Sequence, residues 1–185
     1  IILRIKDRLL VPFQLCLSVI PNFIESKSEP PAILKNKSVI SVGRLNYQKG
    51  YDRLVKAWKY VSEQYPDWTL QIYGSGELKQ ELENQIQMSG LSSVISINSP
   101  TNDIYARLMA SSVYVLSSRY EGLPMVLIEA MACGLPIVSY DCECGPKDLL
   151  SNNDAGILVP EGDINGLAKA IISLISDDNR RLSMG

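Results

Sequence analysis

The stretch SVISVG, at residues 38–43, begins a regular alternation of strand and helix patterns. Its apolar, β-branched residues and its closing glycine are typical of a short strand that is buried on both faces. Residues 51–64 then place apolar side chains on one helical face, and TLQIYG (69–74) repeats the strand pattern. A strand, a helix and a second strand in this order predict two parallel strands joined by a helical crossover.

The same alternation continues along the rest of the chain. Strands that are continuously apolar favour a parallel sheet with helices on both faces. The sequence therefore predicts an α/β domain with a doubly wound, parallel, six-stranded, Rossmann-like sheet over residues 38–185. Its last segment, DDNRRLSMG, is expected to be a charged helix that is cut short. The further strands are expected at 94–97, 113–118, 136–140 and 156–160, and the further helices at 77–90, 101–110, 124–133 and 165–176.

Residues 1–37 do not share this pattern. Residues 25–37 are polar and contain Pro30-Pro31, so we expect a loop or linker. Residues 1–23 combine a basic start with an apolar stretch, which superficially resembles a signal peptide. Pro12 and Gln14 interrupt that stretch and no small-residue cleavage site follows, which argues against this interpretation. A membrane span needs about 20 apolar residues, and the sequence has no such run.

Composition excludes several kinds of site. The chain of 185 residues is 46% hydrophobic and has a net charge of −2, which fits one globular domain and no broad basic surface for nucleic acid. It has no histidine, so histidine bases and histidine metal ligands are excluded. Four cysteines without a secreted-domain framework favour a reducing cytoplasm. Cys142 and Cys144 could be half of a metal site, but no second pair follows, so we expect ordinary thiols and no metal.

The predicted fold indicates where a ligand would bind. In doubly wound sheets, ligands lie beyond the carboxyl ends of the strands, at the point where the strand order reverses. With the common order 3-2-1-4-5-6, that point lies between the first and fourth strands. The segment GRLNYQKG (43–50) follows the first strand and SSRYEGLPM (117–125) follows the fourth. We therefore expect these two segments to form the binding site.

The first of these segments carries two cations in one loop. Gly43 allows a tight turn after the strand, and Arg44 and Lys49 follow it above the sheet edge. Cations with hydrogen-bonding heads at this position suit a phosphate or a diphosphate. The alternative is a solvated loop with ordinary surface charges.

The second segment begins a helix that can bind an anion. Pro124 suits the first helical turn, because its missing N–H costs nothing there. The amides of Leu123, Met125 and Val126 can then point at an anion, aided by the helix dipole.

Two carboxylates flank and interrupt this helix. Glu121 precedes the helix and is compatible with a capping role. Glu129 lies within an apolar run, so it must face solvent or a ligand, or pair with an internal cation, to avoid the cost of desolvation. Sugar hydroxyls are suitable donors for it.

The spacing of the two glutamates, within EGLPMVLIEAMACGLPIV (121–138), closely resembles the retaining glycosyltransferases of the GT-B type, specifically family 4. The resemblance implies the C-terminal, nucleotide-sugar-binding half of such an enzyme. Residues 1–37 would then be an N-terminal remnant and interdomain linker, and residues 38–185 the binding domain, truncated at its C-terminus. The resemblance continues through VIPNFI (19–24), SVGRLNYQKGYDRLVKAW (41–58), LQIYGSGEL (70–78) and AGILVPEGD (155–163).

The resemblance also implies roles for single residues. Arg44 and Lys49 would bind the diphosphate and stabilise the leaving nucleotide, so that with Glu121 they form the catalytic set. Glu121 would contact hydroxyls of the donor sugar, and Glu129 would bind the ribose hydroxyls. The family often has glycine at Pro124, so one amide donor is absent from this chain. The other donor-binding positions would be Gly43, Gly74, the loop Ile97-Asn98-Ser99 near the base, and Leu123, Met125 and Val126.

The implied activity is transfer of a hexose or hexosamine from a nucleotide sugar, with UDP favoured, to a glycan or lipid-linked acceptor of surface polysaccharide synthesis. No cofactor is implied, since fixed cations do the work of a divalent metal. An N-terminal domain would bind most of the acceptor, so the 185 residues alone would be inactive. The implied location is cytoplasmic, with peripheral association of the full-length enzyme with the inner face of the membrane left open.

Three alternatives stay open. A nicotinamide dehydrogenase is suggested by the spaced glycines of YGSGEL (73–78), but the third glycine is absent and the pair follows the second strand. A sugar-nucleotide epimerase of the same two-domain architecture is the second alternative. The third is a nucleotide-binding module that is inactive on its own.

Overall fold

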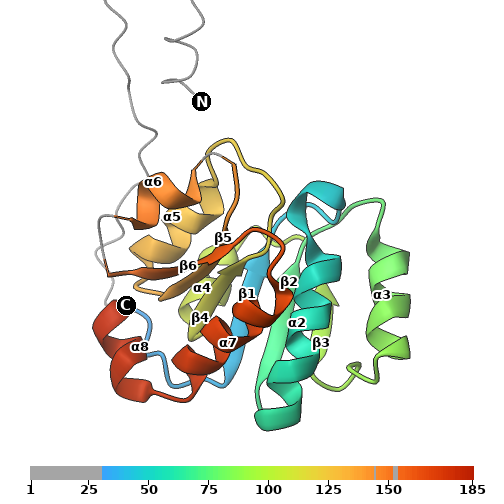
Figure 1. The fold of residues 1–185 in the computed structure, drawn as a ribbon, viewed down its shortest axis with the longest axis horizontal. Helices are drawn as coiled ribbons and strands as arrows, with labels where there is room; N and C mark the ends of the chain where they lie inside the picture. Colours follow the sequence, from blue (N-terminus) through green and yellow to red (C-terminus); the bar gives the residue numbers. More distant parts are fainter. Residues whose placement is uncertain (1–30, 144, 152–153) are drawn as a thin grey trace, which may run out of the picture.

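The computed structural model describes residues 31–143, 145–151 and 154–185, which form a parallel sheet flanked by helices (Figure 1). The sheet has six strands in the order β3-β2-β1-β4-β5-β6, and each neighbouring pair is parallel. The predicted fold and the assumed strand order are therefore confirmed. The strands are β1 Ser38–Val42, β2 Thr69–Tyr73, β3 Ile95–Asn98, β4 Val113–Leu116, β5 Ile137–Asp141 and β6 Gly156–Pro160.

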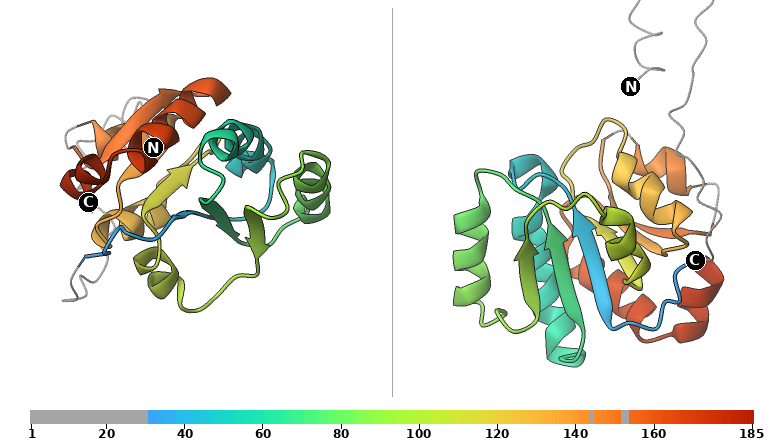
Figure 2. Two further views of the ribbon diagram at one scale, coloured as in Figure 1. Left: turned by 90° about the horizontal axis from the view of Figure 1, so that it is seen from below. Right: turned by 180° about the vertical axis from the view of Figure 1, so that it is seen from behind.

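Helices cover both faces of this sheet (Figure 2). Alternate residues of a strand point to opposite faces, and in β1 the buried Val39 packs on one side while Ile40 packs on the other. One face packs against α2 (Tyr51–Gln64), α3 (Lys79–Met88) and α7 (Ile164–Ile175). The other face packs against α4 (Ile104–Met109), α5 (Met125–Ala132) and α6 (Pro146–Leu150).

Most predicted boundaries agree with the structure to within a few residues. Helix α2 occupies the predicted residues 51–64, and α8 (Asp178–Met184) confirms the charged helix. The prediction missed α6 and the 3-10 turn η1 (Tyr47–Lys49). The sequence holds a local signal for η1, since the Asn46 side chain caps it and Gly50 ends it in the left-handed conformation. Pro124 is not within the first turn of α5 but is its N-cap, with a ψ of 87° that no helix allows.

The predicted linker is described only from residue 31 onward. This part packs against the domain, since the Ala32 amide donates to the Cys133 carbonyl (2.9 Å) and Leu34 is buried. The predictions for residues 1–30 and for Cys144 lie outside the described residues. No helix in the described ranges is long and apolar enough to cross a membrane.

Two glycines allow the loops at the carboxyl edge to approach one another. A Cβ atom on Gly74, after β2, would lie 1.9 Å from the Gly43 carbonyl oxygen, after β1. A Cβ atom on Gly50 would lie 2.2 Å from the Ser117 carbonyl oxygen, after β4. Gly50 also has a φ of +64°, which side chains disfavour. The loops after β1, β2 and β4 are thus packed backbone to backbone.

Candidate functional site

A pocket of about 350 Å³ lies at the carboxyl edge of the sheet, beside the point where the strand order reverses. Its walls come from the ends of β1 and β2, the loop before α4, and helix α5. The sequence predicts a ligand at this edge of the sheet. Of the two segments expected to form the site, 43–50 contributes Gly43 and Arg44 to the lining, and 117–125 contributes no residue. The lining residues are Val42, Gly43, Arg44, Tyr73, Gly74, Ser75, Pro100, Thr101, Ile104, Val126 and Glu129.

One cation and one carboxylate line this pocket without being engaged elsewhere in the described chain. Arg44 is exposed in the loop after β1, and Glu129 is half-buried on α5. Among residues 31–143, 145–151 and 154–185, neither side chain forms an ion pair or a hydrogen bond. The alternative that Glu129 is neutralised by an internal cation is therefore wrong within the described residues.

Lys49 and Glu121 form an ion pair beside the pocket. The Lys49 Nζ lies 2.6 Å from Glu121 Oε1, with side chains 19% and 5% exposed. Ser118 donates to the same oxygen at 2.5 Å. The structure gives Glu121 no capping bond to α5, so the capping interpretation is wrong. Its carboxylate instead joins the loop after β4 to the loop after β1.

The Lys49 side chain lies over Gly43 and next to Tyr51. A Cβ atom on Gly43 would lie 2.9 Å from Lys49 Cε and 3.0 Å from the Tyr51 hydroxyl, so a side chain there would displace the lysine. Burial raises the pKa of Tyr51, a hydrogen bond with Ser41 lowers it, and the charge of Glu121 raises it further. Tyr51 therefore stays a neutral hydroxyl at neutral pH, next to the Lys49–Glu121 ion pair.

The thiol near this site is not reactive at neutral pH. Burial, followed by the charge of Glu121, raises the pKa of Cys142 to about 11. A neutral, buried thiol is a poor nucleophile and a poor metal ligand. In the described part of the chain, no cluster of three or more cysteine, aspartate and glutamate side chains is placed to hold a metal ion.

The segment expected to contact a base does not line the pocket as predicted. Ile97 packs against the core, and the Asn98 side-chain amide donates to Gln71 at 3.0 Å. The lining begins later, at Pro100 and Thr101. Because β3 continues to Asn98 in register with Tyr73, its loop turns over the pocket only after Ser99. Gly74 lines the pocket, as expected.

The first turn of α5 contributes less than predicted. Val126 lines the pocket, whereas Leu123 is 44% exposed and neither it nor Met125 is a lining residue.

The two glycines of YGSGEL have a structural role. Gly74 makes room for the Gly43 carbonyl, and a Cβ atom on Gly76 would lie 2.3 Å from the Leu45 carbonyl oxygen. That carbonyl accepts a hydrogen bond from the Leu78 amide at 3.0 Å. The glycines thus allow the loop after β2 to pack on the loop after β1. They do not form the phosphate-binding turn of a dehydrogenase, which would follow β1.

Comparison with known proteins agrees with this geometry. The chain matches the family described as Glycosyl transferases group 1 over residues 23–185. It is 39% identical over 164 residues to an uncharacterized glycosyltransferase of Haemophilus influenzae, covering 89% of this chain and 46% of the relative. It is 43% identical over 119 residues to the amylovoran biosynthesis glycosyltransferase AmsD of Erwinia amylovora, covering 64% of this chain and 33% of the relative.

Solved structures show the same likeness. Staphylococcus aureus TarM, crystallised with UDP, has a TM-score of 0.90 at 26% identity, covering 98% of this chain and 36% of that one. The C-terminal domain of LpcC from Francisella tularensis has a TM-score of 0.72 at 25% identity, covering 80% of both chains. The chain spans less than half the length of the two curated relatives named above. It belongs to the group 1 glycosyl transferases, family 4, and has the fold of the C-terminal domain of a GT-B glycosyltransferase.

Proposed function

We propose that the pocket binds a UDP-sugar, as the donor site of a retaining glycosyltransferase. The observation that carries this proposal is that Arg44 and Glu129 line one pocket and neither is engaged elsewhere in the described residues. A guanidinium is suited to a diphosphate, and a carboxylate accepts hydrogen bonds from ribose hydroxyls. Structures of TarM, GtfA and HepE, which share this fold, were solved with UDP, which supports UDP as the nucleotide.

Lys49 is the second cation of the proposed site. Its ammonium has three N–H donors, and the bond to Glu121 uses one of them. The others can bind a phosphate oxygen while the bond to Glu121 is kept. Glu121 would then lie beside both the diphosphate and the donor sugar, where its remaining lone pairs can accept from sugar hydroxyls.

This arrangement suggests how the glycosidic bond breaks. Negative charge develops on the leaving nucleoside diphosphate, and Arg44 and Lys49 are fixed cations that would stabilise it without a metal. We propose that the anomeric configuration is retained and that the departing phosphate accepts the proton of the acceptor hydroxyl.

The acceptor is a further part of the proposal. Relatives include a poly(glycerol-phosphate) α-glucosyltransferase of Bacillus subtilis, 29% identical, and a poly(ribitol-phosphate) α-N-acetylglucosaminyltransferase of S. aureus, 28% identical. We propose transfer of a hexose or hexosamine to a glycan or lipid-linked acceptor of surface polysaccharide synthesis, in the cytoplasm or at the inner face of the membrane. Because the chain covers 46% of its Haemophilus relative, we assign most acceptor contacts to another domain.

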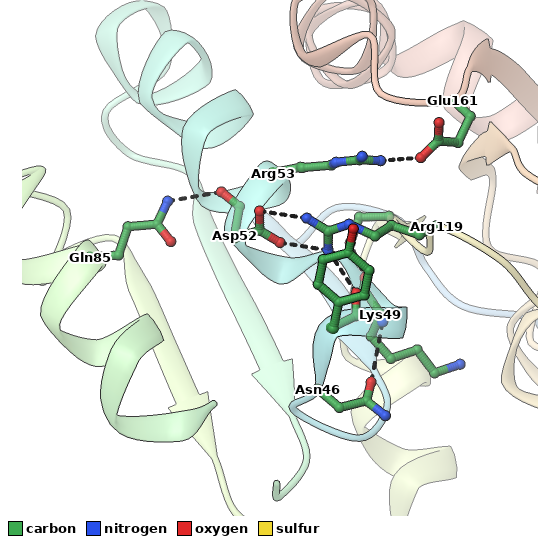
Figure 3. Close-up of polar contacts among 9 residues, drawn as sticks. Asn46, Lys49, Asp52, Arg53, Gln85, Arg119 and Glu161 are labelled. Atoms are coloured by element: carbon green, nitrogen blue, oxygen red, sulfur yellow. Dashed lines mark hydrogen bonds and ion pairs between the residues drawn. The ribbon is translucent and has the colours of Figure 1, made fainter. Parts of the chain in front are cut away.

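Calorimetric titration of the 185-residue chain with UDP and with uridine tests the proposal. Arg44→Ala should weaken UDP binding by about 1.5–3 kcal/mol, the range for a charged hydrogen bond, and leave uridine binding nearly unchanged. Arg53→Ala is the matched control, because Arg53 pairs with Glu161 and does not line the pocket (Figure 3). Equal UDP affinity of the wild type and Arg44→Ala would contradict the assignment.

Product analysis of a polypeptide that also carries the proposed acceptor domain separates the alternatives. Transfer yields a glycoside and UDP, whereas a sugar-nucleotide epimerase yields an isomerised nucleotide sugar and no glycoside. The family match favours transfer.

A further inference from the structure

Arg119, which follows β4, contacts two residues of the segment that carries Lys49. Its guanidinium donates to both carboxylate oxygens of Asp52, at 2.9 and 2.8 Å, and to the Tyr47 carbonyl at 2.7 Å (Figure 3). It also stacks over the Tyr47 ring, 3.9 Å from the centroid. Tyr47 precedes Lys49 by two residues and Asp52 follows it by three. One side chain therefore binds the chain on both sides of the lysine. We call the contacts of Arg119 with Tyr47 and Asp52 the Arg119 clamp.

The backbone of the same turn is docked on the loop around Arg119. The Ser117 hydroxyl donates to the Lys49 carbonyl at 2.8 Å, and the Arg119 amide donates to the Gln48 carbonyl at 2.8 Å. The Gln48 side chain donates to the Tyr120 carbonyl at 3.1 Å. The loop that holds the turn also carries Glu121, the partner of Lys49. The positions of Lys49 and Glu121 thus depend on one interface.

The geometry of the Arg119–Asp52 pair is specific. The Arg119 side chain is 11% exposed, and its planar fork binds the carboxylate through two parallel bonds, which a lysine cannot do. Burial raises the pKa of Asp52, but the hydrogen bond and charge of Arg119 outweigh it and leave the pKa below the usual range. Both groups are therefore charged at neutral pH.

A neighbouring pair shows what a purely structural contact would look like. Arg53, next to Asp52 on α2, pairs with Glu161 in the loop after β6 (Figure 3). It joins two elements as the Arg119–Asp52 pair does, but it holds no part of the Lys49 turn. The two pairs share a helix and differ in what they hold in place.

We propose that Arg119 is a positioning residue of the donor site, which acts through Tyr47 and Asp52 to hold Lys49 against Glu121 and the diphosphate. That the ligand of this site is a diphosphate rests on the proposed function. The contacts of Arg119 with the turn around Lys49 do not depend on that proposal. If Arg119 acts through Lys49, its loss should affect phosphate binding only while Lys49 is present.

The first test uses UDP and uridine with Arg119→Lys and Asp52→Asn, and Arg53→Lys as the matched control. Arg119→Lys and Asp52→Asn should each bind UDP about five- to tenfold more weakly than the wild type, and should bind uridine as the wild type does. A change of this size lies within the range of interaction energies measured between neighbouring residues in double-mutant cycles. Arg53→Lys should bind both ligands like the wild type. In a Lys49→Ala background, Arg119→Lys should cause little further loss. The proposal would be overturned if the clamp variants bound UDP and uridine equally more weakly than the wild type. It would also be overturned if Arg119→Lys reduced UDP affinity as much in the Lys49→Ala background as in the wild type.

A second test needs no ligand. Amide hydrogen exchange of residues 47–52 should become faster in Arg119→Lys and Asp52→Asn, and should stay as in the wild type in Arg53→Lys. Unchanged exchange in the clamp variants would overturn the positioning role even if UDP binds. If the wild type does not bind UDP, the proposed function fails, and the exchange measurement still decides the role of the clamp.

Discussion

The Lys49 ammonium and the Glu121 carboxylate lie 2.6 Å apart although 72 residues separate them in the chain. They meet because β1 and β4 are neighbours in the sheet and their loops emerge at the same edge. The carboxylate is the more deeply buried partner. Lys49 and Glu121 are both expected to contact the donor, and each also neutralises the charge of the other. Replacing either residue should therefore change the stability of the unliganded domain as well as ligand binding.

Lys49→Ala should destabilise the unliganded domain as well as weaken UDP binding. Among the described residues, the variant leaves the buried Glu121 carboxylate with the Ser118 hydroxyl as its remaining side-chain partner, and such a loss costs about 1–3 kcal/mol. Urea unfolding at neutral pH measures it. The sequence alone suggests no such cost, since it presents Lys49 as a loop cation.

The double variant Lys49→Met/Glu121→Gln is the control for this prediction. Replacing both charges removes the unpaired carboxylate, so much of the lost stability should return while UDP binding stays weak. If Lys49→Ala and the wild type unfold at the same urea concentration, the ion pair does not contribute to stability.

Glu129→Gln should weaken the binding of UDP but not the binding of pyrophosphate. Glu129 has no ion pair among the described residues, so the isosteric amide should change the free energy of unfolding by no more than about 0.5 kcal/mol. If the carboxylate binds ribose hydroxyls, UDP binding should weaken by about 1.5–3 kcal/mol, while pyrophosphate binding should survive. Calorimetric titrations with both ligands measure this.

Arg44→Ala is the reciprocal control, because it should weaken the binding of UDP and pyrophosphate alike. A Glu129→Gln variant that loses much stability and both ligands equally would instead show that Glu129 is structural.

Asp52 should stabilise the fold in a defined pH range. Its folded-state pKa lies below the ordinary value of 3.8, so its contribution is present above that value and is lost as the pH falls through the folded-state pKa. The difference in unfolding free energy between the wild type and Asp52→Asn should be constant from about pH 7 to about pH 5 and shrink in more acid solution. Urea unfolding across this range measures it.

Asp67→Asn is a useful comparison for this prediction. A hydrogen bond from Lys37 also lowers the pKa of Asp67, but that pair is exposed. Asp67→Asn should therefore change the free energy of unfolding less than Asp52→Asn does. Added salt should reduce this change further, because solvent screens exposed ion pairs. A shrinking difference for Asp52→Asn at alkaline pH would contradict the assigned direction of the pKa shift.

The elements of the fold were predictable because each has a strong local pattern. Helix α2 has apolar residues at helical spacing, and Gly50 directly before it is its N-cap, so its start at residue 51 has a local signal. The strand order carries no local pattern, and it was assumed from the commonest arrangement of such sheets. The short turn η1 has a local signal that the prediction did not use, because the Asn46 side chain accepts a hydrogen bond from the Lys49 amide and Gly50 ends the turn with a φ of 64°. Its contacts with the loop after β4 are not local.

The candidate site was predictable only in part. Arg44 and Glu129 were assigned from their positions in the sequence and from the family resemblance, and Gly74 from the resemblance alone, and the structure brings all three into one pocket. The Lys49–Glu121 pair and the Arg119 clamp were not predicted, because they join loops 67–72 residues apart whose approach depends on the strand order. Of the residues expected near the base, Ile97 and Asn98 belong to β3, and the pocket is lined instead by Pro100 and Thr101, which follow that strand.

Gly50→Ala should damage the fold more than Gly90→Ala. Both glycines have positive φ, of +64° and +70°, so each substitution carries a backbone cost of about 1–2 kcal/mol. A Cβ atom on Gly90 meets nothing within 4 Å, whereas one on Gly50 would lie 2.2 Å from the Ser117 carbonyl oxygen. That overlap must push apart the loops after β1 and β4, which should cost at least about 1–3 kcal/mol more.

The same displacement should reach the donor site, because Gly50 directly follows Lys49, whose carbonyl is bound by Ser117. Urea unfolding and a UDP titration of both variants measure the two effects. Gly90→Ala should keep the UDP affinity of the wild type, since Gly90 follows α3 and does not line the pocket. Equal stability and equal UDP affinity of the two variants would show that the contact between Gly50 and Ser117 does not fix the loops in place.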